Sequence, residues 1–244
     1  MSGAERATVT VRVADSLRFL LRVRDRGAGQ RQVLFDPDAT IGHLVQAAGV
    51  PIPEVGAVRL DGGPAAIAAR TAPGSVVEVL PVHRPEPVPD GGFLLDVGLG
   101  SLARRLRLLG LDAAWSADAD DPELVARARA EDRVLLTQDR RLLMRRALGR
   151  AGEVRGALVR GSGTDTQLTD VLDRFAPALA PLTRCTACGA TLEPVQKATV
   201  VDLLESGTRR TQDDFSRCPA CGRIYWRGAH TRRIEAIVRA ATGP

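Results

Sequence analysis

In the middle of the chain, short and continuously apolar runs alternate with stretches whose apolar residues recur at helical spacing. The apolar runs lie at residues 93–95, 113–115, 134–137 and 156–159. The helical stretches begin near residues 99, 122, 140 and 166, and three of them end near 109, 148 and 175. Strands without polar alternation that are separated by helices are typical of a parallel sheet covered by helices. The pattern therefore predicts an α/β domain over residues 93–176.

The first segment, residues 6–82, has a different pattern. Its predicted strands are 8–13, 18–23, 58–60 and 75–80. Thr40 is a suitable N-cap for a helix over residues 41–48, whose apolar residues share one face. This order resembles the β-grasp, ubiquitin-like fold of small sulfur-carrier proteins, although the last strand is not followed by their free Gly-Gly tail. The missing tail favours an adaptor or substrate-binding module over carrier chemistry.

Two proline-rich joints divide the chain. Residues 81–92 contain four prolines, which disfavour a helix or a central strand, so this stretch is predicted to be a semi-extended linker. A weaker joint lies at residues 176–181, just before the first cysteine. The predicted domains are therefore a β-grasp domain over 6–82, the α/β domain over 93–176, and a C-terminal module with a final helix over 182–241.

All four cysteines of the chain occur as two Cys-x-x-Cys pairs, Cys185 with Cys188 and Cys218 with Cys221. Two such pairs complete the tetrahedral four-thiolate shell that zinc prefers, so the spacing predicts a structural zinc in a zinc ribbon. Because four protein ligands leave no position for water, this zinc is expected to stabilise the fold rather than to react. The alternatives are two disulfides or four free core thiols. Disulfides need an oxidising compartment, and residues 1–10 lack the apolar core of a signal peptide.

Charge and composition limit the classes of binding partner that we expect. The formal net charge is +5 and the pI is about 9.6, and the basic residues are almost all arginine. A mildly basic protein with arginine clusters is compatible with a nucleic-acid partner. Aromatic residues make up 3% of the chain, so base stacking is not expected to be the main mode of recognition. No run approaches eighteen apolar residues, so we expect no membrane span and a cytoplasmic location.

Aspartates follow each of the predicted central strands. Asp96 comes directly after residues 93–95 and Asp139 comes just after 134–137, while Asp120, Asp121 and Asp165 follow the other two strands. Ligands of open parallel sheets bind beyond the carboxyl ends of the strands, so these acids are expected at one edge. Carboxylates gathered there would repel one another without a cation, and their oxygens suit Mg²⁺ or Mn²⁺. Such a metal would activate water for hydrolysis of a phosphodiester.

Each of these aspartates also has a simpler interpretation, because an aspartate before a helix commonly caps it. Asp96 and Asp139 both precede predicted helices, and Asp121 is the expected cap of the helix that begins near Pro122. Asp165 follows a glycine-rich loop that needs polar residues in any case. Both interpretations stay open at this point.

Arginines flank the two leading aspartates and the cysteine pairs. The predicted RNA contacts are Arg104, Arg105, Arg140, Arg141, Arg145 and Arg227. A guanidinium group suits phosphate. The alternative is a solvated helix face, since runs of like charge are commonly exposed.

Three stretches, residues 93–96, 99–110 and 133–139, resemble the mutator-seven C-terminal ribonuclease family. That family is PIN-like, ends in a zinc ribbon with four cysteines, and in bacteria often carries an N-terminal ubiquitin-like domain, so the resemblance covers nearly the whole chain. Two positions depart from it, Arg105 where an aromatic residue is usual and Gln138 where a basic one is usual. The resemblance implies that Asp96 and Asp139 bind a catalytic metal. A PIN-like site has three or four acids, for which Asp120 or Asp121 and Asp165 are the further candidates.

The sequence thus predicts a metal-dependent ribonuclease with structural Zn²⁺ and catalytic Mg²⁺ or Mn²⁺. The expected partner is RNA, with tRNA and other structured RNAs as candidates, and a protein partner could bind the β-grasp domain. The alternative is a non-catalytic RNA-binding or adaptor protein that has kept the fold and the zinc. A third interpretation, sulfur transfer or RNA modification through the β-grasp domain, is disfavoured by the missing Gly-Gly terminus.

Overall fold

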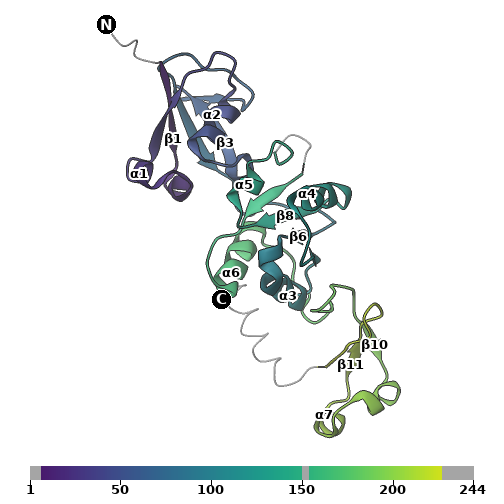
Figure 1. Cartoon of the computed structure of the whole chain (residues 1–244). Coiled ribbons are helices and arrows are strands. Elements are labelled where there is room, and N and C mark those ends of the chain that lie inside the picture. Colours follow the sequence, from purple (N-terminus) through teal and green to yellow (C-terminus); the bar gives the residue numbers. More distant parts are fainter. Residues whose placement is uncertain (1–6, 150–153, 227–244) are drawn as a thin grey trace. The chain divides into compact units, whose positions relative to one another are not determined.

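The computed structural model describes residues 7–149 and 154–226. The chain forms two compact parts. Figure 1 shows its helices and strands, coloured along the sequence. The first part comprises residues 1–86 together with 137–158, and the second part comprises residues 87–136 together with 159–244. The predicted domain boundaries at 82, 93, 176 and 182 stay predictions.

The first part contains a five-stranded sheet in the order β2-β1-β5-β3-β4. Its strands are β1 (Thr8–Val13), β2 (Gln30–Leu34), β3 (Val55–Leu60), β4 (Gly63–Ala65) and β5 (Val76–Pro81). The central pair, β1 and β5, is parallel, and the other pairs are antiparallel. Helix α2 (Ile41–Ala48) packs on this sheet and buries Ile41, Leu44, Val45 and Ala48. This is the predicted β-grasp fold.

Both ends of α2 follow from local chemistry. The hydroxyl of Thr40 accepts a hydrogen bond from the backbone N–H of His43 at 3.3 Å, as predicted for an N-cap. Gly49 ends the helix at φ 108°, in the left-handed region that glycine adopts without strain.

The strand predicted at residues 18–23 is wrong. Residues Asp15–Leu20 form the 3₁₀ helix η1, and Val23–Arg26 form the short helix α1. Leu17, Leu20 and Leu21 are fully buried, which is the i, i+3, i+4 spacing of a helical face. The second strand is instead the more polar β2, whose residues alternate between exposed and half-buried.

The first part also contains two elements from later in the chain. Helix α5 (Arg140–Leu143) buries Leu142 and Leu143, and strand β9 (Gly156–Leu158) contacts the 3₁₀ helix η2 (Ile52–Glu54). The helix predicted to reach residue 148 ends at Leu143, because the chain turns there and Leu148 forms a parallel bridge with Val154.

The second part contains parallel strands in the order β7-β6-β8, namely β7 (Ala113–Trp115), β6 (Phe93–Leu95) and β8 (Val134–Thr137). The last residue of β8, Thr137, belongs to the first part. The helices are α3 (Gly100–Leu108), α4 (Asp121–Ala130) and α6 (Thr164–Phe175). All three residues of β6 are buried, and the rings of Phe93 and Phe175 pack edge to face with centroids 5.2 Å apart. The α/β prediction with a parallel sheet is confirmed.

A small antiparallel sheet follows in the same part. Its strands are β10 (Glu193–Val195), β11 (Phe215–Arg217) and β12 (Ile224–Trp226), in the order β10-β11-β12. The connection holds the 3₁₀ helices η4 (Lys197–Thr199) and η5 (Val201–Leu203) and the helix α7 (Ser206–Thr211). Val200, Leu204 and Phe215 form its apolar core. The C-terminal helix predicted up to residue 241 lies outside the described residues.

Within the described ranges, no helix has both the length and the apolar character needed to cross a bilayer.

Candidate metal centre and strand-end carboxylates

The four cysteines form one cluster. Their Sγ atoms all lie within 4.8 Å of one another, with Cys185 to Cys221 at 3.6 Å and Cys188 to Cys218 at 3.4 Å. Sulfurs around a tetrahedral zinc with bonds of about 2.3 Å would be about 3.8 Å apart, so the cluster has the size that zinc requires. The two pairs come from loops that flank the antiparallel sheet.

A glycine shapes each cysteine loop. The N–H groups of Gly189 and Gly222 donate to the carbonyls of Cys185 and Cys218, and both glycines have a positive φ. These turns bring the two sulfurs of each pair to one side. They explain why a glycine follows each Cys-x-x-Cys pair.

The protonation of the thiols also indicates a cation site. Burial raises the pKa of Cys185, but the hydrogen bonds of Tyr225, 3.1 Å away, and of the backbone of Cys188 and Ala187 together outweigh burial and lower this pKa to about 6. A backbone hydrogen bond from Ala190 lowers the pKa of Cys188, whereas burial and the neighbouring sulfurs raise it to about 12. Four thiolates cannot share this space without a counter-charge. A divalent metal such as zinc resolves the conflict, so the donor set fits the predicted metal.

Arg107 of α3 joins the first cysteine loop to the α/β sheet. Its side chain is 3% exposed, and Nε donates to the carbonyl of Ala113 at 2.7 Å. Nη1 donates to the carbonyls of Thr186 and Ala187, at 3.3 and 2.7 Å. Burial lowers the pKa of Arg107, which is the expected direction for a cation removed from water. The sequence pattern places Arg107 in an arginine cluster but gives no sign of this internal role.

Asp96 lies at the carboxyl end of β6. Its N–H donates to the carbonyl of Leu136 at 3.0 Å, and its Oδ1 accepts from the N–H of Val97 at 2.6 Å, capping the 3₁₀ helix η3 (Val97–Leu99). Trp115 fixes the turn by donating from Nε1 to the carbonyl of Val97 at 3.1 Å. Asp96 is therefore a helix cap, as one of the two interpretations predicts, and its carboxylate lies at the end of β6.

Asp120 and Asp121 follow β7 at the same end of the sheet. Asp120, not Asp121, is the N-cap of α4: its Oδ1 accepts from the N–H of Glu123 at 2.9 Å, and its own N–H donates to Oε2 of Glu123 at 3.0 Å. The prediction of Asp121 as the cap is one residue too late, because this reciprocal pair requires the glutamate three positions after the cap. Asp121 begins the helix and is half-buried.

Asp165 lies in the first turn of α6 rather than in a loop. Its Oδ1 is 3.6 Å from Nη2 of Arg105, so this predicted acid and this predicted RNA contact pair with each other. The carboxylate is 78% exposed.

Asp139 lies in the first part, where it caps α5. Its Oδ1 accepts from the N–H of Arg141 at 2.7 Å, and its own N–H donates to the hydroxyl of Thr137 at 2.8 Å. Since Asp96 and Asp139 belong to different compact parts, their pairing at one metal stays a prediction.

The predicted RNA-binding arginines differ in their surroundings. Arg104, Arg141 and Arg145 are exposed, and Arg105 is half-buried beside Asp165. Arg140 is half-buried and donates from Nη2 to the carbonyls of Leu20 and Gly49. Arg227 lies outside the described residues.

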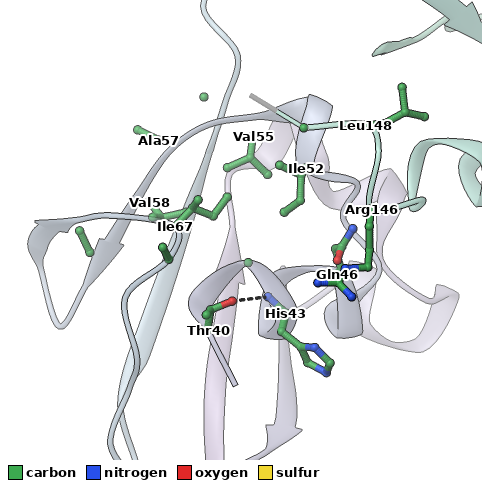
Figure 2. A pocket seen from close by; sticks show the side chains of 15 residues that line it. Thr40, His43, Gln46, Ile52, Val55, Ala57, Val58, Ile67, Arg146 and Leu148 are labelled. Carbon is green, nitrogen blue, oxygen red and sulfur yellow. Dashed lines mark hydrogen bonds between the residues drawn. The ribbon is translucent and has the colours of Figure 1, made fainter. Parts of the chain in front are cut away.

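A cavity of about 930 Å³ lies in the first part, between α2, β3 and residues 146–149. Figure 2 shows its apolar wall, with Ile52, Val55, Val58 and Ile67, and its polar side, with His43, Gln46 and Arg146. No sequence motif indicates it.

Comparison with known families gives two matches. Residues 91–238 match the family model described as the Mut7-C RNAse domain, and residues 6–86 match the model described as Mut7-C ubiquitin. No curated protein matches the chain.

Proposed function

The chain belongs to the Mut7-C RNAse domain family, and from that premise we propose that it is a metal-dependent ribonuclease that hydrolyses RNA phosphodiester bonds at a cluster of aspartates. A bound Mg²⁺ or Mn²⁺ would supply an activated water and stabilise negative charge on the phosphate. RNA, including tRNA or other structured RNA, is the proposed substrate. A protein partner of the ubiquitin-like domain and a cytoplasmic location stay predictions.

The register of the sheet is the observation that carries this proposal. Leu95 of β6 is level with Trp115 of β7 and with Leu136 of β8, so the three parallel strands end at one edge. Asp96 follows the first strand, and Asp120 and Asp121 follow the second. Asp139 comes three residues after Leu136, and three residues span at most about 11 Å. A connection of this length allows Asp139 to reach this edge, as the proposal requires.

The capping bonds of these aspartates are compatible with metal binding. An ionised carboxylate offers about four acceptor positions on its two oxygens, and one backbone N–H occupies a single position. Such a bond also orients the side chain before a metal arrives. Asp165, which pairs with Arg105 and lies later in the chain, is proposed as the last acid of the site.

We propose that Cys185, Cys188, Cys218 and Cys221 hold a structural zinc. Its closed shell gives it no chemical step, and its role is to hold the antiparallel sheet and its loops together. Through Arg107 this module is bonded to α3, the helix that begins just after Asp96. Among the proposed RNA contacts, the exposed Arg104, Arg141 and Arg145 have the greatest reach for phosphate.

Conversion of Asp96 or Asp139 to asparagine tests the proposal. Asparagine caps a helix about as well as aspartate, so both variants should keep the wild-type melting temperature. If the carboxylates hold the catalytic metal, cleavage of mixed RNA in Mn²⁺ or Mg²⁺ should fall by at least about 100-fold, as EDTA should also cause.

The matched control is Asp90→Asn, which removes an exposed carboxylate at the amino end of the same strand, β6, and should leave cleavage unchanged. Full cleavage by Asp96→Asn and Asp139→Asn would reject the proposed site. A wild-type protein that binds RNA but does not cut it would favour the non-catalytic adaptor.

A further inference from the structure

Residues 137–158 belong to the same compact part as the ubiquitin-like domain, although they follow strand β8 of the α/β sheet. We call residues 137–149 and 154–158 the clamped segment. It begins two residues before Asp139, the aspartate proposed above as a metal ligand. How this segment is held therefore bears on how Asp139 is held.

Arg140, the neighbour of Asp139, anchors the start of the clamped segment. A single nitrogen, Nη2, donates to the carbonyl of Leu20 at the end of η1 and to the carbonyl of Gly49 at 2.9 Å. Gly49 is the left-handed residue that ends α2, and a Cβ there would lie 3.1 Å from the Leu20 carbonyl and 3.5 Å from this nitrogen. Two turns of the ubiquitin-like domain thus converge on one guanidinium group.

The middle and the end of the segment are held as well. Gln46 of α2 donates from Nε2 to the carbonyl of Met144 at 3.2 Å. Glu54, whose side chain is fully buried, accepts from the N–H of Leu158 at 2.9 Å. Between these points Arg146 and Leu148 line the cavity opposite α2 and β3 (Figure 2). The ubiquitin-like domain therefore contacts the segment along its described length.

Helix α5 cannot orient Asp139 without this support. It has four residues, whereas an isolated helix shorter than about 12 residues is marginal in water. Asp139 is its N-cap, so the carboxylate points where the first turn of α5 directs it. That turn is fixed by the buried Leu142 and Leu143 and by the bonds of Arg140 to the ubiquitin-like domain.

We propose that the ubiquitin-like domain is an internal clamp that positions Asp139 for catalysis, with Arg140, Gln46 and Glu54 as positioning residues. The catalytic half of this statement rests on the proposed function of Asp139. The clamp gives the ubiquitin-like domain a role within its own chain, independent of any protein partner. It also gives Arg140 a role other than the predicted RNA contact.

The test uses full-length Arg140→Met, which keeps an apolar stem and removes the donors. If Arg140 positions Asp139, the Mn²⁺ concentration for half-maximal cleavage should rise by about tenfold, as when a residue behind a metal ligand is lost. The KM for RNA should change by less than about twofold. Arg140→Lys, whose ammonium can still donate to both carbonyls, should recover part of the metal affinity. Arg59→Met, which removes an exposed cation from β3 of the same domain, should behave as wild type.

Amide hydrogen exchange of the metal-free protein supplies a readout that does not depend on cleavage. In Arg140→Met the amides of residues 140–148 should exchange at least about tenfold faster, with those of α6 unchanged. If Arg140→Met does not fold, Gln46→Ala, which removes one bond, takes its place with the same expected direction. If Arg140→Met exchanges faster than wild type but the wild-type protein has no ribonuclease activity, the clamp is kept and the proposed function is rejected. A raised KM with unchanged metal dependence and unchanged exchange would show that Arg140 contacts RNA and would overturn the clamp.

Discussion

Single arginines in this chain have several different roles, although their sequence neighbourhoods look alike. Arg104 lies exposed, its Nη2 3.4 Å from the hydroxyl of Ser101, and the buried Arg107 bonds three carbonyls within the same part. Arg105, between them, pairs with Asp165. Arg104 and Arg107 lie three positions apart in α3, so the difference comes from the carbonyls that surround Arg107 and not from helical spacing. At the residue scale, then, a basic cluster is a mixture of surface and internal cations.

Arg107→Ala should destabilise the second part. It would leave the carbonyls of Ala113, Thr186 and Ala187 without their donor, a loss of about 2–4 kcal/mol in the free energy of unfolding. Thermal or urea unfolding measures this. Arg104→Ala, on an exposed position of the same helix, is the control and should change stability by less than about 0.5 kcal/mol. Equal effects of the two substitutions would contradict the internal role of Arg107.

Cys188→Ser should abolish stoichiometric zinc binding. The serine hydroxyl is not a thiolate, so the remaining three ligands leave an open shell. Metal analysis of the purified variant against wild type measures the loss, and near-ultraviolet spectra report whether Trp226 and Tyr225 keep their packing. A wild-type protein isolated without zinc, or a variant that retains it, would count against the structural zinc.

At the scale of elements, the sequence was most informative where one residue type leaves few choices. The short apolar strands, the Thr40 cap and the cysteine loops were all predictable, because each depends on neighbours within a few residues. The strand expected at 18–23 was not, since an apolar run of that length suits a strand or a buried helical turn equally. Glu54 was missed for a related reason: a lone acid before a strand gives no sign that it will receive the N–H of Leu158, far along the chain.

The N-terminus of α4 allows capping and catalysis to be separated. Asp120→Ala should destabilise the protein by about 1 kcal/mol, because it removes the acceptor for the Glu123 N–H. Asp120→Asn should keep the free energy of unfolding within a few tenths of a kcal/mol of wild type. Any loss of RNA cleavage in this variant would then be caused by the loss of the carboxylate charge. Parallel melting curves and cleavage assays measure both. If Asp120→Asn cleaves normally, Asp121 becomes the remaining candidate after β7.

At the scale of the whole molecule, the two compact parts do not follow the order of the chain. The domain boundary that the sequence predicts in the proline-rich linker stays a prediction, and the first part comprises more than residues 1–86. It then takes residues 137–158 from the middle of the α/β region. No local pattern predicts this exchange, because it rests on bonds between residues about 100 positions apart, such as Gln46 to Met144.

A fragment of residues 1–86 should unfold cooperatively but with a lower stability than the same part in the full chain. It keeps the five strands and α2, but it lacks the Arg140 donor to Leu20 and Gly49 and the Leu158 donor to Glu54. Lost bonds of this kind correspond to about 2 kcal/mol or more. Urea unfolding followed by hydrogen exchange of β1 and β5 in both forms measures the difference. A fragment as stable as the same part in the full chain would mean that residues 137–158 contribute nothing to this part.

The interleaved arrangement has a consequence for how the protein is made. During translation the last strand of the ubiquitin-like sheet, β5, leaves the ribosome more than fifty residues before Arg140 does, and N-terminal domains generally fold first. The carbonyls of Leu20 and Gly49 are then already fixed when the nascent chain reaches Arg140. Residues 137–158 then pack onto an N-terminal domain that has already folded, so this domain acts as a folding template for a later segment of its own chain.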